Sequence, residues 1–459
     1  MIDEKFLVLP RVVEEPKVIK SKVIKKPNIE MLTEEQSTIF DLITNTPINN
    51  FSQTLLTGYA GSGKTFLVTK ILEEILYKHK HINIAITAPT NKAVRVLKET
   101  SSLSEDNHRV TFVTLHSLLS LKRVITIDGK EEFKESGFNS DIQYYKIIIV
   151  DEVSMLDNFL YYKLLGQAVS NKIMLLFIGD RGQIPPVNGG ESELFTKHLD
   201  NNFNLTKIIR QGADNPIIKC AEIVRNGERL EHKNILNSQN NGVIFLKLKT
   251  EEPLLSVYFN SINFKKNPNF VKVLAYTNSA VNYYNELIRK LIYGENCGQL
   301  CVGEKMVCDK PVRNSKNQVI LNNNDEFEII SFKLKKETKK YDFNYYDVDI
   351  LSNGEEYTIK ILANESIDSF NEELEKLKEK ALNAKAMLKK EAWVKYYKLL
   401  ERYAAVKYNY ALTVHKSQGS TFDNSIVILC DINRMKIKEE KDRLLYTAIT
   451  RAKDKLFII

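Results

Sequence analysis

The fold of this chain is decided by residues 53–65, which read QTLLTGYAGSGKT. The apolar start of this stretch predicts a β-strand over 53–57, and the residues from Lys64 to about Tyr77 have the apolar spacing of a helix. The loop between them fits the pattern G-x-x-x-x-G-K-[ST]. Its glycines let backbone N–H groups approach a phosphate beside the positive end of a helix. A chance glycine-rich turn would lack this strand and helix, so the stretch predicts a nucleotide-binding α/β domain.

Short apolar segments continue this pattern along the chain. A first set lies at 83–88, 145–150 and 173–178, and a second set at 271–276, 425–430 and 456–459. Short apolar strands that alternate with helices are typical of parallel sheets covered by helices on both faces. The sequence therefore predicts two α/β lobes.

Two inserts interrupt the lobes. The first contains Asp128-Gly129 between two extended segments, and this dipeptide is a strong signal for a β-hairpin. The second lies between Cys301 and Tyr410. It begins with strand-like segments and continues into a charged stretch rich in alanine and leucine over 369–403. We expect one or two surface helices there, with salt-bridging faces.

The composition, with 43% hydrophobic and 27% charged residues among 459, is that of an ordinary globular protein. No apolar run approaches the roughly 20 residues that cross a bilayer, and the N-terminus has no apolar signal region. We therefore expect a cytoplasmic protein that does not contact a membrane. A formal net charge of +8 favours polyanionic partners without identifying one.

Two features of the composition have alternative interpretations. Cys297, Cys301 and Cys308 form a cluster, but their spacing fits no common zinc pattern, so free thiols are the preferred interpretation. The lysine-rich segment 1–30 is interrupted by prolines. It is interpreted as a solvated arm, with a supplementary nucleic-acid contact as the alternative.

Two carboxylates complete the predicted phosphate chemistry. The buried strand Ile147 to Val150 ends in Asp151 and Glu152, and ligands of α/β sheets bind at this edge of the strands. Asp151 is predicted to hold Mg²⁺ together with the Thr65 hydroxyl. Glu152 would orient and deprotonate the attacking water. An Asp-Glu pair is common by chance, so the argument depends on the pair together with the Lys64 loop.

Three further residues are candidates for the γ-phosphate. Gln183 lies in a polar turn after the segment 173–178 and can bind the γ-phosphate or the attacking water. Arg210 and Arg451 adjoin apolar segments far downstream. An inserted arginine can stabilise the charge of a phosphoryl-transfer transition state. For most arginines a surface or salt-bridging role is the simpler explanation.

The ordered set of motifs resembles superfamily 1 helicases, most closely their Dda- and RecD-like branch. The resemblance runs from Leu32 to Ile459. The matching segments, in chain order, are 32–36, 58–65, 87–94, 114–117, 150–155, 179–187, 210–227, 274–278, 413–419 and 446–454. The resemblance implies two RecA-like P-loop NTPase domains that bind ATP between them and close on it.

This resemblance assigns the nucleotide site. Lys64, Glu152, Gln183, Arg210 and Arg451 would be catalytic, with the two arginines contributed by the second lobe. ATP and Mg²⁺ are the implied cofactors. The further residues predicted to contact the nucleotide are Gln36, Gly58, Ala60, Gly61, Ser62, Gly63, Phe66 and Gly419.

The strand contacts are likewise implied by the resemblance. They are Pro89, Thr90, Asn91, Thr114, His116, Thr277, Asn278, Thr413, His415 and Lys416. Hydroxyls and amides bind phosphates without reading sequence, and aromatic rings stack on bases. The hairpin insert resembles the branch's duplex-splitting pin, with Phe133 as the candidate wedge. A structural role is the alternative for either histidine, and a hairpin-core role for Phe133.

The implied domains follow the motif order. They are a basic tail over 1–30, a RecA-like domain over 31–204 with the hairpin insert at 119–145, a second RecA-like domain over 205–300 and 411–459, and an insert over 301–410 with an SH3-like β part and a helical arm. The arm is expected to pack against the hairpin.

The leading hypothesis is an ATP-dependent DNA helicase that moves 5′ to 3′ on single-stranded DNA, in replication, recombination or repair. It would act as a monomer at duplex junctions, with a single-strand-binding protein as a further partner, and in the host cytoplasm if its origin is a phage. The alternatives are a translocase without strand separation, an RNA substrate, and a binding protein that nucleotide switches. Glu152, Gln183 and two arginines favour hydrolysis over the switch.

Overall fold

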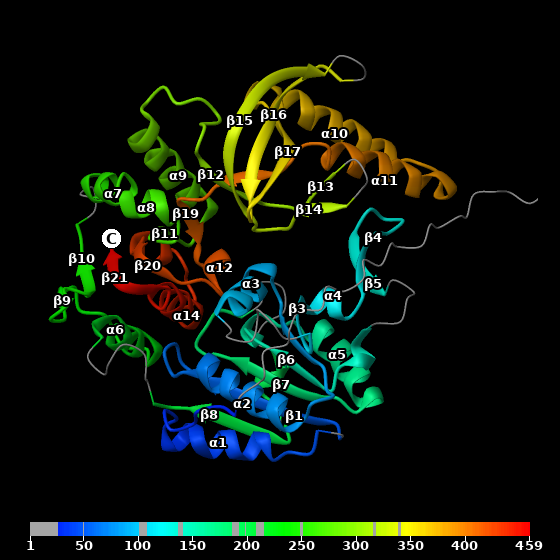
Figure 1. Ribbon diagram of the computed structural model, residues 1–459. Coiled ribbons are helices and arrows are strands. Elements are labelled where there is room, and N and C mark those ends of the chain that lie inside the picture. The colour runs from blue at the N-terminus through cyan, green and yellow to red at the C-terminus, as the bar shows by residue number, and fades with distance from the viewer. Residues whose placement is uncertain are drawn as a thin grey trace, which may run out of the picture.

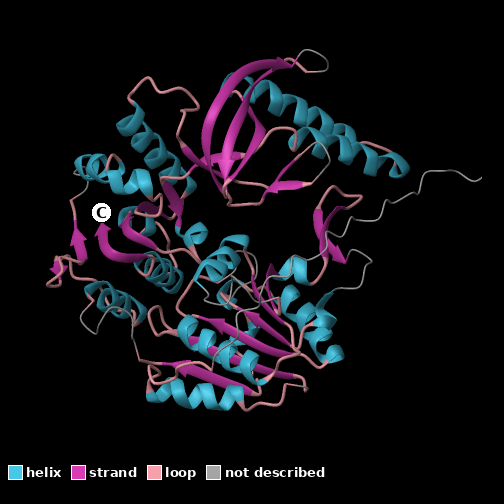
Figure 2. Cartoon of the chain, viewed as in Figure 1, coloured by secondary structure: helices cyan, strands magenta, loops and turns pink. Residues whose placement is uncertain are grey.

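The computed structural model describes residues 26–48, 50–100, 108–135, 141–185, 192–197, 199–207, 215–247, 251–314, 318–337 and 341–459. The expected basic tail lies mostly outside these residues. The described part of the chain is built around two six-stranded sheets and one five-stranded sheet, and their arrangement is shown in Figures 1 and 2. The prediction of two α/β lobes is confirmed.

The first lobe is a parallel sheet with helices on both faces. Its strand order is β3-β2-β6-β7-β1-β8. The strands are β1 (Ser52–Gly58), β2 (Ile84–Ala88), β3 (Val110–Thr114), β6 (Ile147–Val150), β7 (Met174–Gly179) and β8 (Asn201–Leu205). The helices are α1 (Glu34–Thr44), α2 (Lys64–Lys78), α3 (Asn91–Thr100), α4 (Leu115–Leu118) and α5 (Asn158–Asn171).

Two apolar cores form on the two faces of this sheet. One contains α1 and α2 and the other contains α5. Every residue of β6 and β7 is buried because both faces are covered. The sheet includes β3 and β8, which the sequence did not predict, and β8 ends at Leu205, one residue beyond the expected domain boundary.

The second lobe repeats this design. Its strand order is β19-β11-β20-β21-β10-β9, with only β9 antiparallel among the paired strands of the described sheet. The strands are β9 (Ile235–Leu236), β10 (Gly242–Phe245), β11 (Val271–Ala275), β19 (Ala411–Thr413), β20 (Phe422–Val427) and β21 (Ala452–Ile458). The helices are α6 (Pro216–Arg225), α7 (Glu251–Phe259), α8 (Ile262–Lys266), α9 (Asn278–Tyr293), α12 (Val414–Ser417), α13 (Leu429–Ile432) and α14 (Lys438–Ile449).

One predicted strand was misplaced in this lobe. The strand expected over 425–430 is β20, which ends at Val427, and α13 occupies the last predicted positions. Ile428, which precedes this short helix, and Ile432 at its end are both buried, and a short apolar run of this kind cannot be distinguished from a strand by its composition.

The first insert is a two-stranded hairpin of β4 (Leu121–Ile125) and β5 (Glu131–Glu135). Gly129 occupies its turn with φ of 76°, in the left-handed region that favours glycine. The short 3₁₀ helices of this lobe are η1 (Asp141–Tyr144), η2 (Val153–Met155) and η3 (Glu193–Phe195).

The second insert contains an antiparallel sheet and two helices. The sheet order is β17-β16-β15-β12-β18, and β13 and β14 form a separate pair. The strands are β12 (Lys305–Cys308), β13 (Val312–Arg313), β14 (Val319–Leu321), β15 (Glu326–Glu337), β16 (Phe343–Ser352), β17 (Glu355–Leu362) and β18 (Val406–Tyr408). After η4 (Asn364–Ser366), α10 (Ile367–Leu382) and α11 (Ala386–Leu400) form the helical arm.

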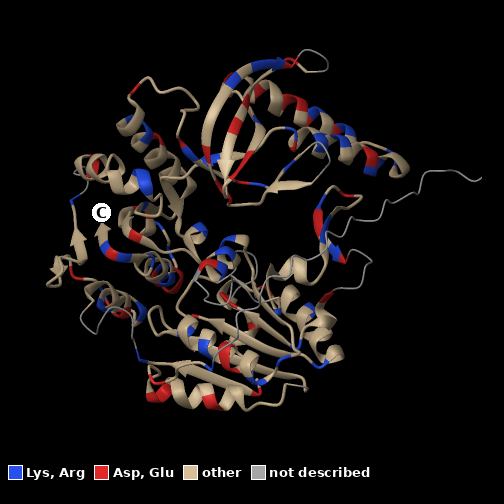
Figure 3. Cartoon of the chain, in the orientation of Figure 1, with Lys and Arg blue, Asp and Glu red and all other residues tan. Residues whose placement is uncertain are grey.

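The helical arm extends from the insert toward the hairpin (Figure 1). Acidic and basic residues are interspersed along α10, where two lysine–glutamate pairs form, whereas the charged residues of α11 are mainly lysines (Figure 3). Within the described residues, no helix combines the length and apolar character that a membrane crossing requires.

Candidate nucleotide site and strand-binding surface

The phosphate loop joins β1 to α2. Gly61 and Gly63 have φ of 86° and 80°, which side chains rarely tolerate. A Cβ on Gly58 would lie 2.6 Å from Ser62 Oγ and 3.0 Å from Leu205 Cβ. The Lys64 ammonium donates to the carbonyls of Gly58 and, at 3.0 Å, of Tyr59. The glycines are therefore required by backbone conformation and by close packing.

Gln36 approaches the phosphate loop from α1. It forms a capping box with Thr33, which fixes the start of the helix. Its side chain is buried, and Nε2 lies 3.5 Å from the Ser62 carbonyl. The structure thus brings Gln36 to the loop, whereas Thr65 and Phe66 lie exposed on the first turn of α2.

The two carboxylates follow β6 at the same edge of the sheet. Asp151 Oδ1 accepts the Glu152 N–H at 2.8 Å, and Glu152 has a left-handed φ of 53°. Desolvation, and then the Glu152 charge, raise the pKa of Asp151 to about 7. Desolvation also raises the pKa of Glu152, against the opposing charges of Arg451 and Lys64. These four side chains therefore lie within electrostatic reach of one another.

Arg451 reaches this group from the second lobe. It follows α14 and is 5% exposed. Its guanidinium donates to the carbonyls of Thr447 and Ser420, both at 3.0 Å, and at 3.1 Å to Thr450 Oγ1. These bonds fix its direction. Among the charges that act on Glu152, that of Arg451 lowers its pKa the most, so this arginine of the second lobe lies within electrostatic reach of a carboxylate of the first.

Gly419 brings the backbone of the second lobe to the same place. It has φ of 70°, and a Cβ there would lie 3.3 Å from Ala93 Cβ and 4.0 Å from Glu152 Oε1. A larger side chain would press on the first lobe. Gly419 therefore permits the close approach of the two lobes beside Glu152.

Gln183 lies on the loop after β7 and is 6% exposed. Its Oε1 has no hydrogen-bond partner in the described part of the chain, and a buried polar atom of this kind is costly unless a ligand or water satisfies it. The same loop is held from the second lobe, because Gln418 Nε2 donates to the Ile184 carbonyl at 2.8 Å.

Sequence reasoning missed a tyrosine that connects the lobes. The Tyr446 hydroxyl of α14 donates to Asp180 Oδ2 at 2.6 Å and accepts the Ala60 N–H at 3.2 Å. Asp180 in turn accepts the Gly182 N–H at 2.9 Å. Both Tyr446 and Asp180 lie inside motif segments recognised in the sequence, and that position was the available signal.

A second contact between the lobes involves the phosphate loop directly. The Arg225 guanidinium of α6 lies 3.6 Å from the centre of the Tyr59 ring, at a distance typical of cation–π contacts. Arg210, the other predicted arginine, lies outside the described residues.

Four predicted strand-contacting threonines share one structural position. Each lies at or just after the carboxyl end of a strand and caps the next helix by accepting a backbone N–H at 3.2–3.3 Å: Thr90, Thr114, Thr277 and Thr413. The strands are neighbours in pairs, β2 with β3 and β11 with β19. Each lobe therefore places two hydroxyls at one edge, and we call these four residues the threonine edge.

The flanking candidates differ in accessibility. Asn91, Asn278 and Lys416 are exposed, and Pro89 is partly buried. Thr277 also donates to Asp431 Oδ1 at 2.9 Å.

Phe133, the candidate wedge of the hairpin, contacts His116, one of the predicted strand contacts. The rings of Phe133 and His116 lie 4.6 Å apart at 53°, and Phe133 is 47% exposed. Burial lowers the pKa of His116. His415 lies further from its neighbour, with its ring 6.4 Å from that of Tyr276, and burial lowers its pKa too. Both histidines are therefore biased toward neutral rings.

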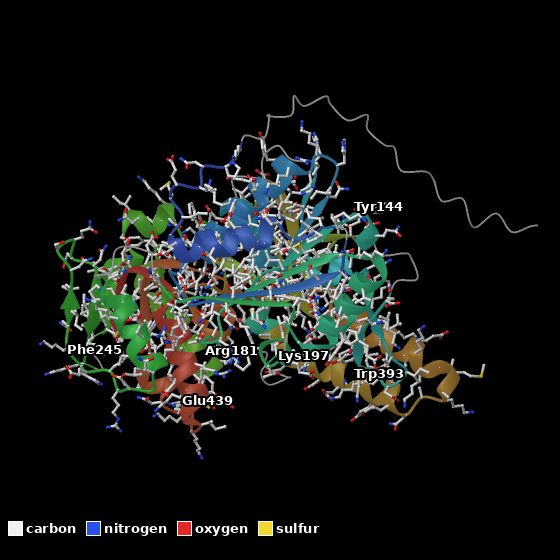
Figure 4. All side chains as sticks on the ribbon, turned by 90° about the horizontal axis from the view of Figure 1, so that it is seen from below. Tyr144, Arg181, Lys197, Phe245, Trp393 and Glu439 are labelled. Atoms are coloured by element: carbon white, nitrogen blue, oxygen red, sulfur yellow. The ribbon has the colours of Figure 1, made fainter. Side chains whose placement is uncertain are left out.

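The helical arm packs against the hairpin turn. The Tyr397 hydroxyl donates to the Gly129 carbonyl at 2.8 Å, and Arg123 pairs with Glu401. A Cβ on Gly129 would lie 2.2 Å from the Trp393 ring. Trp393 lies on the arm, at the opposite side of the molecule from Phe245 (Figure 4). The contact expected between arm and hairpin is present.

One α/β lobe carries the phosphate loop and the carboxylate of Glu152, and Arg451 of the second lobe lies within electrostatic reach of that carboxylate. This arrangement defines a two-lobe P-loop NTPase. Residues 44–189 match the family model of an AAA domain, and residues 408–459 match that of a UvrD-like helicase C-terminal domain. Together with the relatives described next, these matches indicate a superfamily 1 helicase similar to the Dda, RecD and Pif1 proteins.

Named relatives align along most of the chain. The ATP-dependent DNA helicase dda of Enterobacteria phage T4 is 28% identical over 93% of this chain and 99% of its own length. The RecBCD enzyme subunit RecD of Buchnera aphidicola subsp. Schizaphis graminum is 26% identical over 90% of this chain and 71% of its own. An uncharacterized protein of Acanthamoeba polyphaga mimivirus is 26% identical over 92% of this chain and 98% of its own.

A solved structure shows the same fold. The Pif1 helicase from Bacteroides, in complex with ADP-AlF3 and single-stranded DNA, aligns with a TM-score of 0.51 and 18% identity, over 93% of this chain and 92% of that one. At this identity the likeness extends to the fold alone.

Proposed function

We propose that the chain is an ATP-dependent DNA helicase that moves 5′ to 3′ along single-stranded DNA and unwinds duplex DNA. The proposal depends on one observation, the approach of Arg451 to Glu152 across the two lobes. A protein that only binds nucleotide has no use for a water-activating carboxylate beside a second-lobe arginine. Relatives named as ATP-dependent DNA helicases occur in phage T4 and in Campylobacter jejuni.

The first lobe supplies groups for phosphate binding and water activation. Lys64 and the amides of residues 60–63 would bind the phosphates, and Gln36 beside the loop would contact the adenine. Glu152 would accept the proton of the attacking water, which Gln183 Oε1 is free to orient. The raised pKa of Glu152 suits a general base near neutral pH.

Mg²⁺ fits the donors beside the phosphate loop. Asp151 and Thr65 supply carboxylate and hydroxyl oxygens, which this cation favours. The pKa of Asp151 is raised by burial and by Glu152, and a cation would favour its charged form. Bound there, Mg²⁺ would neutralise charge on the phosphates.

The second lobe would respond to the γ-phosphate. Arg451 would stabilise the charge that develops on its oxygens, together with Arg210. The threonine edge spans both lobes, so opening and closing of the lobes would change the spacing of its two halves. Hydroxyls that bind phosphates without reading sequence suit a motor that moves along any strand.

The hairpin would separate the strands. Phe133 is exposed on β5 and leans on His116, so its ring can stack against the first base pair of a junction. The helical arm would hold the turn of the hairpin through the hydrogen bond from Tyr397 to the Gly129 carbonyl.

The cellular setting is part of the same proposal. The chain would act in DNA replication, recombination or repair, as a monomer in the cytoplasm, with a single-strand-binding protein as a further partner.

Two measurements test the proposal together. The rate of ATP hydrolysis, measured with and without single-stranded DNA, should rise strongly when the strand is present. The variants Lys64→Ala and Glu152→Gln should retain almost no hydrolysis under either condition. Lys70→Ala is the matched control, because Lys70 lies on the same helix and pairs with Glu73 away from the phosphate loop.

Strand displacement on tailed duplexes gives the direction. We expect unwinding from a 5′ tail, and unwinding from a 3′ tail alone would overturn the direction. A rate of hydrolysis that does not change when DNA is added would instead favour a binding protein that nucleotide switches. DNA-stimulated hydrolysis without strand displacement would favour a translocase.

A further inference from the structure

A cavity of about 350 Å³ lies between α9 of the second lobe and the sheet of the second insert. This volume is within the range of small-ligand pockets. Asn278, Thr413 and Lys416, three of the predicted strand contacts, line it. The cavity is therefore continuous with the surface on which the proposed function places the DNA strand.

The cations of this cavity already have counter-charges. Lys416 and Lys407 both pair with Asp309, at 2.6 and 2.9 Å. Lys92 lies 3.9 Å from the Glu326 carboxylate. With its lysines neutralised in this way, the cavity is poorly suited to a free anion such as phosphate.

Two groups can be distinguished among the amides that line the cavity, apart from Asn364 and Asn409. Asn285 and Gln299 bind backbone groups and hold the fold: Asn285 Oδ1 accepts the N–H groups of Tyr410 and Ala411, and Gln299 Nε2 donates to the Leu362 carbonyl. Such amides are not available to a ligand.

The second group of amides is available. Asn278 and Asn282 lie one turn apart on α9 and are exposed, and the partly buried Asn324 of the insert lines the same cavity. No hydrogen bond in the described part of the chain uses these three side-chain amides. An amide presents a donor beside an acceptor, which matches the edge of a nucleobase.

The cavity also has an apolar surface for the face of a ring. Leu300 and Met306, both buried, form part of this lining, and Val281 and Tyr408 also belong to it. Neutral polar edges above apolar side chains are the combination by which proteins hold bases that have left the stack.

We propose that this cavity receives one unstacked base of the bound single strand, with Asn278 and Asn282 holding its edge. The proposal rests on the proposed strand binding and adds a defined place for one nucleotide between the second lobe and the insert. One base held outside the stack would fix the register of the strand relative to the second lobe.

Abasic substitution along a bound strand tests this proposal. The probe is a thymidine tail that ends in a duplex, so that the junction fixes the register, and a single abasic site is moved along the tail. Binding is measured by fluorescence anisotropy without nucleotide. We expect one position at which loss of the base weakens binding by about 5- to 20-fold, the effect of losing one held base.

A cavity-filling variant links that position to the cavity. Asn282→Phe should bind the tail without any penalty at the sensitive position. Ser279→Phe is the matched control, since Ser279 is exposed on the same helix and does not line the cavity; it should keep the penalty. Asn282→Ala, which fills nothing, should reduce the penalty and shift the base preference at this position.

Each other outcome overturns the proposal. A uniform response along the tail means that no single base is held apart, and a sensitive position that Asn282→Phe leaves unchanged places the base elsewhere. Failure of the wild-type protein to bind any tail would refute the proposed function itself, which separates the two failures.

Discussion

Replacing Gly129 with alanine is expected to detach the hairpin from the helical arm. The φ of Gly129 is 76°, and a side chain in this region costs about 1–2 kcal/mol. The new Cβ would lie 2.2–2.5 Å from three atoms of the Trp393 ring, which is itself buried. The turn must therefore move by more than 1 Å to reach ordinary contact, roughly 3.5 Å between carbons.

This movement also breaks a hydrogen bond. The Tyr397 hydroxyl donates to the Gly129 carbonyl at 2.8 Å, and such a bond contributes about 1 kcal/mol. The two costs add up to about 2–3 kcal/mol, so the equilibrium constant for docking of the hairpin on the arm should fall roughly 30- to 150-fold.

The assay compares strand displacement with DNA-stimulated ATP hydrolysis. We expect Gly129→Ala to lower the unwinding rate at least 10-fold, while hydrolysis stays within about twofold, because the turn is remote from the phosphate loop. Gly166→Ala is the matched control, since its Cβ would meet nothing within 4 Å. Normal unwinding by Gly129→Ala, or an equal loss of hydrolysis, would refute the reasoning.

The remaining predictions concern single side chains. Arg451→Ala should lower kcat for ATP by about 10³-fold or more, with little effect on KM, in steady-state assays. Phe133→Ala should spare DNA-stimulated hydrolysis and weaken strand displacement; equal losses would remove its assignment as the wedge. Tyr446→Phe should lower kcat more than ATP affinity, because it releases Asp180 and Ala60; an unchanged kcat would contradict this. Asp151→Asn should abolish hydrolysis yet raise Tm by a few degrees at pH 8. Folded Asp151 keeps its proton up to a pKa of about 7, so its burial penalty appears as pH rises from about 4 toward 7. The increase in Tm caused by Asp151→Asn should therefore become smaller toward pH 5. An increase in Tm that is the same at every pH would show that the buried charge of Asp151 is not its cause.

Strands buried on both faces were predicted, and the edge strands of the first sheet were not. β6 and β7 are apolar throughout and were located to within two residues. β8, which reads NNFNL, and β3 lie at the two edges of the first sheet. An edge strand has one neighbour and faces solvent on its open side, so β8 carries little apolar signal. β3 reads VTFVT, whose residue types do favour a strand, and it was missed although this signal is present.

Helix boundaries within the second insert show a similar limit. The charged stretch over 369–403 predicted helix, and the structure divides it into α10 and α11 at residues 383–385. The division allows α11 to turn back and present Trp393 and Tyr397 to the hairpin. That contact depends on a distant part of the chain, and local pattern does not encode it.

The sequence by itself determined the phosphate loop, the carboxylate pair and the two α/β lobes. These features follow from local rules, because glycine conformation, apolar runs and helix starts are set within a few residues of backbone. Only the tertiary structure decided which of these residues meet. The approach of Arg451 to Glu152, the bridge of Tyr446 between Ala60 and Asp180, and the packing of Gly129 on Trp393 join segments far apart in the chain. Such contacts arise from the packing of whole lobes and inserts, whose geometry no short segment specifies.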